Sequence, residues 1–246
     1  MRPRVTGVLR TIGRWSAAAA ATGFACLSYA YLTLPDVRPL KASNPSTTAF
    51  IDLRAREALA NGVKPRRVQR WVSYSHISSN LTRAVLVAED DAFWQHEGVD
   101  FEQLQESLEL DWARGRFVRG GSTITQQLAK NLYLSPSRNP LRKLEEFVIA
   151  RRLEAELKKP RILELYLNVI EWGDGIYGAE AAARTYFHST AADVGPSESA
   201  LLAGAIVNPH VLNPAHPNAR LIRRQQIILR RMGAVSPPQE SKGPVL

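Results

Sequence analysis

The chain has 246 residues, 45% of them hydrophobic, which is enough to bury the core of one sizeable domain. Its formal net charge of +9 at pH 7 predicts an anionic partner: nucleic acid, phospholipid or a phosphorylated substrate. The only cysteine, Cys26, has no second cysteine to pair with. A disulfide framework and a thiolate metal centre are therefore excluded.

The first feature along the chain is a run without charged residues from Trp15 to Leu34. About 20 residues at about 1.5 Å per residue span a hydrocarbon core of roughly 30 Å, so this run predicts a transmembrane helix. The basic tail at residues 1–14 has arginines and no acidic residue, which predicts that it stays in the cytoplasm while the rest is exported. A signal peptide cleaved after Ala30 is the alternative, although the apolar run continues past that position.

A linker and entry segment is expected at residues 35–66, which are rich in proline, serine and threonine and show little periodicity. From residue 67 to residue 233 the hydrophobic pattern is helical, without runs of alternating β-branched residues. We therefore predict one mainly α-helical domain over 67–233, followed by a C-terminal tail at 234–246.

Polar residues and prolines mark the expected helix starts in this domain. The predicted starts are Ser79 or Asn80, Asp100 with Gln103, Ser122, Pro160 before "RILELYLNVIEW", and Pro196.

The segment "GGSTITQQLAKN", residues 120–131, combines two glycines, many neutral hydrogen-bonding groups and one lysine. If Ser122 begins a helix, the apolar residues recur every four positions and face the core, while the polar residues share another side. The apolar set is Ile124, Leu128 and Leu132, and the polar set is Thr123, Gln126, Gln127 and Lys130. A phosphorylated sugar fits such a surface, and an ordinary amphipathic helix with a polar solvent face fits it equally well.

Two glutamates are candidates for acid–base chemistry. Glu89 follows the apolar run "AVLVA" and precedes Phe93 and Trp94, surroundings that raise the pKa of a carboxyl group toward the range of a general base. Glu146 supplies a second carboxylate, with Arg142 four residues earlier on the same helix face. A pair of carboxylates beside a polar groove indicates glycosyl chemistry, although a solvated surface glutamate is the simpler interpretation of either residue alone.

Five segments, "EDDAFWQHEGVD", "GGSTITQQLAKNLYL", "RKLEE", "ELYLNVIEWGDGIYGAEAAARTYF" and "SALLAGAIVNPHVLNP", follow one another within roughly residues 80–215. In order and spacing they resemble the five motifs of the peptidoglycan glycosyltransferases, glycosyltransferase family 51. Because the chain has no S-x-x-K or K-T-G motif of a transpeptidase, it resembles the monofunctional biosynthetic members.

The resemblance implies a lysozyme-like helical fold with a small membrane-proximal jaw and an enzyme that polymerises lipid II. It makes Glu89 the base that deprotonates the 4-hydroxyl of the acceptor N-acetylglucosamine. The resulting oxygen attacks C1 of the donor N-acetylmuramic acid with inversion, and undecaprenyl pyrophosphate leaves. Glu146 matches a second glutamate that organises the donor side.

The same resemblance assigns the substrate-binding residues. Three match basic positions around the pyrophosphate, namely Lys130, Arg138 and Arg142. Three others would hold sugar and phosphate oxygens, namely Ser122, Gln126 and Gln127. The resemblance gives no cofactor as certainly required and assigns no metal ligand, although Mg²⁺ or Mn²⁺ could assist at the pyrophosphate. Glu145 stands where several relatives have lysine, which makes this region more acidic.

The expected partners are lipid II, the growing glycan strand, membrane lipids and proteins of cell-wall synthesis or division. The expected location is the bacterial inner membrane, with a single span, a cytoplasmic N-terminus and a periplasmic catalytic domain that meets no nucleic acid. Two alternatives stay open: a lysozyme-like hydrolase that cuts the glycan, and a membrane-anchored scaffold without catalysis.

Overall fold

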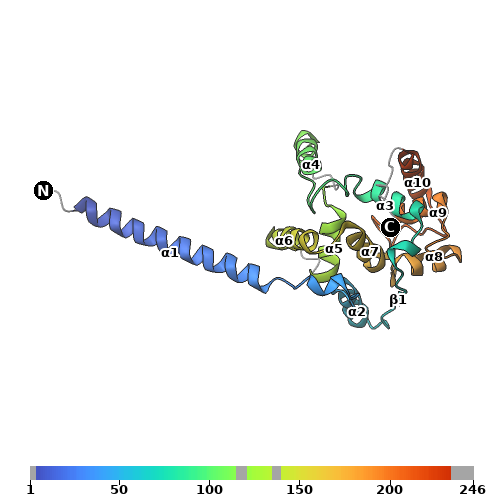
Figure 1. The fold of residues 1–246 in the computed structure, drawn as a ribbon, viewed down its shortest axis with the longest axis horizontal. Helices are drawn as coiled ribbons and strands as arrows, with labels where there is room; N and C mark the ends of the chain where they lie inside the picture. Colours follow the sequence, from blue (N-terminus) through green and yellow to red (C-terminus); the bar gives the residue numbers. More distant parts are fainter. Residues whose placement is uncertain (1–3, 115–120, 135–139, 234–246) are drawn as a thin grey trace, which may run out of the picture. The chain divides into compact units, whose positions relative to one another are not determined.

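The computed structural model describes residues 4–114, 121–134 and 140–233. The chain divides into two compact units, Met1–Asp36 and Val37–Leu246. The first unit contains one helix, α1 (Arg4–Thr33), which includes nearly all of the run expected to be helical (Figure 1). Within the described parts of the chain, no helix has the combined length and apolar character that crossing a membrane requires.

The second unit is mainly helical, as predicted, and carries one small sheet. Its α-helices are α2 (Ala49–Ala60), α3 (Ser79–Glu89), α4 (Phe101–Arg114), α5 (Ile124–Tyr133), α6 (Pro140–Glu156), α7 (Lys159–Val169), α8 (Ala179–Phe187), α9 (Pro196–Ala205) and α10 (Ala219–Met232). Two 3₁₀ turns are η1 (Arg38–Lys41) and η2 (Tyr74–His76). The strands β1 (Val68–Gln69), β2 (Glu171–Gly173) and β3 (Ile176–Tyr177) lie in the order β1-β3-β2, with β3 parallel to β1 and antiparallel to β2.

Helix α5 lies at the centre of the second unit. It packs against α2, α6 and α7, and Figure 1 shows it between α6 and α7. Its apolar residues Ile124, Leu128 and Leu132 are buried, as their four-residue spacing predicts. A second group of packed helices consists of α3, α9 and α10. The two groups are connected by a hydrogen bond from the backbone N–H of Ile124, at the start of α5, to the side chain of Asp90, which follows α3.

The expected linker at residues 35–66 is only partly irregular, because it contains α2. Thr48 caps this helix by accepting a hydrogen bond from the backbone N–H of Ile51, at 3.1 Å. Ile51 is the buried residue of α2, and one buried position in twelve gives almost no periodicity in the sequence. The helix is held by tertiary packing against α5, which explains why the pattern did not predict it.

The helix predicted to run through Trp172 ends earlier, at Val169, and the β2–β3 hairpin follows. Gly178 adopts φ +85° after the hairpin, and a Cβ atom there would lie 2.8 Å from the backbone oxygen of Asn168. Trp172 and Tyr177 are buried, so the aromatic residues of this segment serve the core, but from strands instead of a helix.

The predicted helix starts at Asp100, Pro160 and Pro196 are confirmed. The other two are wrong by one or two positions, because Ser78 caps α3 and Thr123 caps α5.

The fully buried Asn168 of α7 holds the segment after β1 in place. Its Oδ1 accepts a hydrogen bond from the backbone N–H of Val72 at 2.9 Å. Its Nδ2 donates to the carbonyl oxygens of Val72 at 2.9 Å and of Glu164 at 2.8 Å. The side chain thus pairs with both backbone groups of Val72, as a neighbouring strand would.

We expect Asn168→Ala to lower the free energy of unfolding by about 2–3 kcal/mol, because it removes three hydrogen bonds of a fully buried side chain and leaves both backbone groups of Val72 without partners. Denaturant unfolding of the purified protein measures the change. The matched control is Asn131→Ala, which removes a partly exposed bond of 2.8 Å to the Gln127 carbonyl of its own helix and should cost less than about 1 kcal/mol. Equal losses for the two variants would contradict the role given to Asn168.

Candidate active site

Glu89 is the last residue of α3, and a hydrogen-bonded chain holds its partly exposed side chain. The side-chain amide of Gln127 on α5 donates to Oε2 of Glu89 at 2.9 Å. The Gln127 amide oxygen accepts from the hydroxyl of Tyr166 on α7, also at 2.9 Å. Residues from three helices therefore fix one oxygen of the carboxylate.

Burial raises the pKa of Glu89 above its ordinary value, and the neighbouring Asp90 charge raises it further. The hydrogen bond from Gln127 and the charge of Arg224 act in the opposite direction without cancelling the effect. Burial also raises the pKa of Tyr166 well above its usual range, so its hydroxyl keeps its proton and donates to Gln127. The arrangement is that of a carboxylate prepared to accept a proton.

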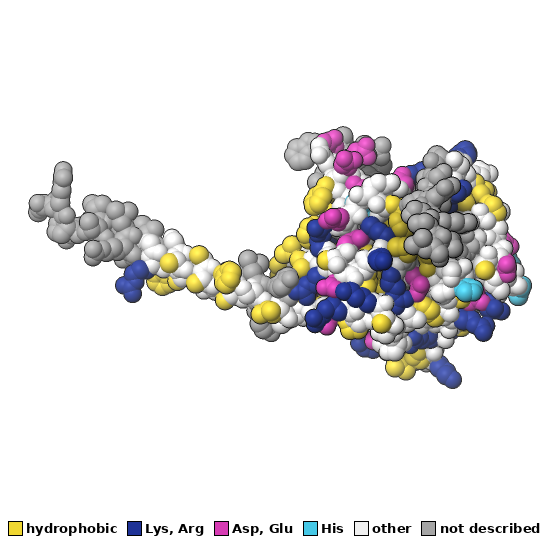
Figure 2. Space-filling view, in the orientation of Figure 1, with side chains coloured by type: hydrophobic (Ala, Val, Ile, Leu, Met, Phe, Trp, Pro, Cys, Tyr) yellow, Lys and Arg dark blue, Asp and Glu magenta, His cyan; other side chains and the backbone are white. Residues whose placement is uncertain are grey.

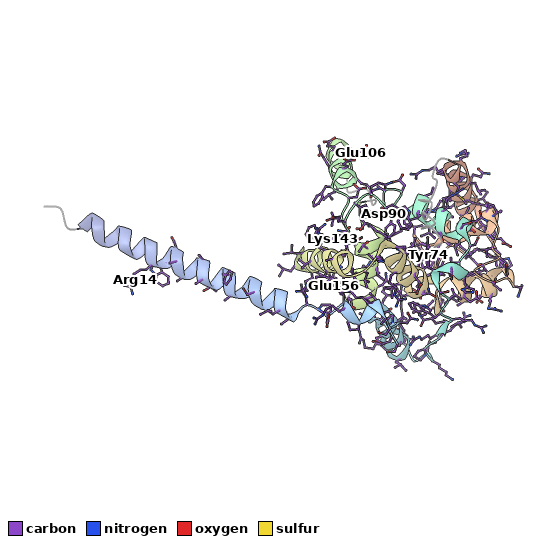
Figure 3. The ribbon with its side chains drawn as sticks, viewed as in Figure 1. Arg14, Tyr74, Asp90, Glu106, Lys143 and Glu156 are labelled. Atoms are coloured by element: carbon purple, nitrogen blue, oxygen red, sulfur yellow. The ribbon has the colours of Figure 1, made fainter. Side chains whose placement is uncertain are left out.

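The next residue, Asp90, joins α3 to α5 and is labelled in Figure 3. Its side chain is 2% exposed and accepts from the backbone N–H of Ile124, the first residue of α5, at 2.8 Å. It also accepts from Nε2 of His96 at 2.9 Å. Because the backbone N–H of Gly98 donates to Nδ1 of His96, the imidazole is neutral and carries its proton on Nε2. A negative charge at the start of α5 is favoured by the helix dipole.

The start of α5 separates two glutamines that the sequence grouped together. Gln126 is 4% exposed, and its amide oxygen accepts from the backbone N–H of Thr123, while Thr123 Oγ1 accepts from the N–H of Gln126. Thr123 also donates to the carbonyl oxygen of Gly98 at 2.7 Å. The structure thus uses the Gln126 side chain in a capping box and directs Gln127 to Glu89.

The second predicted carboxylate, Glu146 on α6, is 3% exposed and lies between two cations. Arg142 donates to Oε2 at 2.9 Å, as the four-residue spacing predicted, and Lys143 pairs with Oε1. Lys143, labelled in Figure 3, also donates to the hydroxyl of Ser122 at 3.0 Å. The sequence analysis missed Lys143, although its three-residue spacing from Glu146 could have indicated the pair.

Ser122 connects the two carboxylates. Its hydroxyl bonds to Lys143, the partner of Glu146, and its carbonyl oxygen lies 3.5 Å from the Nε2 atom of Gln127, the partner of Glu89. Five of the predicted site residues therefore belong to one polar arrangement: Glu89, Glu146, Ser122, Gln127 and Arg142. The predicted Arg138 lies outside the described residues.

Lys130 lies on the wall of a cavity of about 230 Å³. The cavity lies among α2, α5 and the segments after α7 and α9, and its lining residues are Phe50, Arg54, Gln127, Lys130, Asn131, Ile170, Glu171, Ile206, Val207 and Pro209. Gln127 forms part of this wall and donates a hydrogen bond to Glu89, so the cavity lies close to Glu89.

Figure 2 shows lysine and arginine side chains beside carboxylates around α6 and α7. Several of these cations are in ion pairs, such as Lys159 with Glu154 at 2.8 Å and Arg151 with Glu97 at 2.8 Å. Ion pairs between neighbouring side chains thus partly compensate the net charge of the chain at this surface.

The sequence pattern of the family described as transglycosylase matches residues 56–233. The chain is 47% identical over 195 residues to a protein of Dechloromonas aromatica (strain RCB), covering 79% of this chain and 84% of the relative. It is 48% identical over 199 residues to a protein of Laribacter hongkongensis (strain HLHK9), covering 80% and 87%. Both relatives carry the name biosynthetic peptidoglycan transglycosylase. The chain therefore belongs to the transglycosylase family.

Proposed function

We propose that the chain is a peptidoglycan glycosyltransferase, which polymerises lipid II into glycan strands and releases undecaprenyl pyrophosphate. The observation that carries the proposal is the hydrogen-bonded chain from Tyr166 through Gln127 to Glu89, which ends at a carboxylate of raised pKa. Relatives named as biosynthetic transglycosylases support the same reaction.

Glu89 acts as the general base in this proposal. Of the described residues, none hydrogen-bonds to its Oε1, so that oxygen is available to the 4-hydroxyl of the acceptor N-acetylglucosamine. As the proton moves to Glu89, the hydroxyl oxygen attacks C1 of the donor N-acetylmuramic acid from the side opposite the pyrophosphate. The bond between C1 and the pyrophosphate oxygen breaks, and the configuration at C1 is inverted.

The cations of the site act on the leaving group. Lys130, Arg138 and Arg142 offset the negative charge that grows on the pyrophosphate, and Glu146 keeps Arg142 and Lys143 in position. Ser122 and Gln127 bind oxygens of the sugars or phosphates. Gln126 contributes indirectly, because its side chain starts the helix that carries Gln127 and Lys130.

The lysozyme-like hydrolase is the alternative for the same pair of carboxylates. Hydrolysis by water produces no pyrophosphate, so it gives Lys130 no anion to stabilise, and the names of the relatives do not favour it. A scaffold protein needs no general base, so this alternative does not account for the raised pKa of Glu89. Incubation of the protein with lipid II and, separately, with purified peptidoglycan distinguishes synthesis, cleavage and inactivity.

For the location, we propose that α1 anchors the chain in the bacterial inner membrane, with residues 1–14 in the cytoplasm and the second unit in the periplasm. The support is the uncharged run from Trp15 to Leu34, the arginines before it, and the continuous helix over this part of the chain. Membrane lipids, the glycan strand and proteins of cell-wall synthesis or division are the partners available to an enzyme in this position.

We expect Glu89→Gln to lower kcat for lipid II polymerisation by at least ~100-fold, because an amide cannot accept the proton of the acceptor hydroxyl. The variant should be as stable as the wild type or more stable. The raised pKa means that ionised Glu89 costs the folded state free energy at neutral pH, and the amide removes that cost. Polymerisation kinetics and denaturant unfolding measure the two effects.

The matched control for this variant is Glu97→Gln, at an exposed glutamate a few residues further along the chain. It should polymerise lipid II at nearly the wild-type rate. Nearly normal turnover by Glu89→Gln would remove Glu89 from the role of base.

The topology is tested by fusing to the C-terminus a reporter that is active only after export. We expect an active reporter and a full-length chain in the membrane fraction, because the arginines hold the N-terminus in the cytoplasm. Deletion of residues 15–34 should remove both signals. A soluble mature protein that starts near Tyr31 would show a cleaved signal peptide instead.

A further inference from the structure

Three potential metal ligands lie together where the β2–β3 hairpin meets the segment between α9 and α10. Glu171 belongs to β2, Asp174 to the hairpin turn and His210 to the segment after α9. One ligand atom from each residue lies within 4.8 Å of the other two. Two carboxylate oxygens and one imidazole nitrogen are a donor set suited to Mn²⁺ or Zn²⁺.

Two of these donors already have the spacing that one small cation requires. Neighbouring ligands of an ion with bonds of about 2.1 Å lie about 3.0 Å apart, and opposite ligands of an octahedral ion lie about 4.2 Å apart. Oε2 of Glu171 and Nε2 of His210 are 3.0 Å apart. Asp174 is exposed in the hairpin turn, so rotation of its side chain can bring an oxygen into the same range.

The surroundings orient the buried member of this group. Glu171 accepts from Nε of Arg54 at 3.2 Å through Oε2 and from the backbone N–H of Gly175 at 3.3 Å through Oε1. Outer partners of this kind fix the direction of a ligand carboxylate. Arg54 also lies in an ion pair with Glu57, so part of its charge is already compensated.

A second observation comes from Tyr177. Its hydroxyl is buried and has no hydrogen-bond partner among the residues that the structure describes. The sheet register pairs Tyr177 with Glu171, which places both side chains on the same face of the hairpin. A buried hydroxyl is normally satisfied, and a water molecule bound to a cation beside Glu171 would supply the missing partner.

We propose that Glu171, Asp174 and His210 form a binding site for one divalent cation of the Mn²⁺ type. The ion takes the place of the proton on Nε2 of His210, and water fills its other positions. Because Glu171 lines the cavity that also contains Lys130, the ion is held at the wall of that cavity. The occupant of the cavity rests on the proposed function, under which part of the lipid II substrate lies there. Binding of the ion does not depend on turnover of that substrate.

The opposing interpretation is an ordinary ion-pair network, in which Arg54 and His210 only neutralise the buried charge of Glu171. In that case the three donors have no measurable affinity for a metal ion. Asp174 and His210 are exposed, so each can be changed with little effect on folding, whereas Glu171 is buried and is left intact in the test.

The test is a titration of the purified full-length protein with Mn²⁺, in which electron paramagnetic resonance measures the free ion. We expect one Mn²⁺ bound per chain by the wild type, and at least about tenfold weaker binding by both Asp174→Asn and His210→Gln. The control is His216→Gln, at an exposed histidine of the same segment, which should bind Mn²⁺ like the wild type. Circular dichroism checks that every variant is folded.

Absence of Mn²⁺ binding at millimolar concentration would overturn the proposal, and so would equal affinity in all the variants. An ion whose binding is lost in Glu146→Gln but kept in Asp174→Asn would also overturn it, since that ion would belong to the other carboxylate. Lipid II polymerisation is measured separately. A wild-type chain that binds Mn²⁺ at this group and does not polymerise lipid II would contradict the proposed function and leave the metal site standing.

Discussion

The buried carboxylate of Asp90 is the interaction on which the candidate site depends. It ends α3 and receives the first backbone N–H of α5, so it joins the helices α3, α9 and α10 to the group around α5. The neutral imidazole of His96 supplies its other hydrogen bond, which limits the cost of burying the charge. Glu89 directly precedes Asp90, and Gln127 lies in the first turn of α5. The junction at Asp90 therefore brings Glu89 and Gln127 within hydrogen-bond distance.

The junction also explains why the pKa of Glu89 lies above that of a surface glutamate. The same packing that holds its carboxylate removes water from it, and the fixed charge of Asp90 disfavours its ionised form. The hydrogen bond from Gln127 keeps the carboxylate in one orientation, and Tyr166 keeps Gln127 in one orientation. The second unit therefore holds a side chain in a state of higher free energy at neutral pH, as is common for catalytic groups.

Much of this could be predicted from the sequence, wherever spacing alone decides the outcome. The apolar period of α5 and the four-residue separation of Arg142 from Glu146 are local and were read correctly. The N-cap of α5 was predicted wrongly, because Ser122 and Thr123 are both good N-cap residues. The contact of Thr123 with the distant Gly98 distinguishes them. That shift of one residue places Gln126 inside the capping box. Helix α2 and the β2–β3 hairpin depend on tertiary packing, which a local pattern does not contain.

The central claim is that Glu89, a partly buried carboxylate of raised pKa, accepts the proton of the acceptor hydroxyl. The pH dependence of kcat/KM for lipid II polymerisation tests this claim most directly. The base works only when it is ionised, so the rate should fall toward low pH with a midpoint above about 4.3, the ordinary pKa of glutamate. The residual activity of Glu89→Gln should lack this acidic limb. The account is contradicted if the wild type and Glu89→Gln show the same acidic limb, since the titrating group would then be another residue.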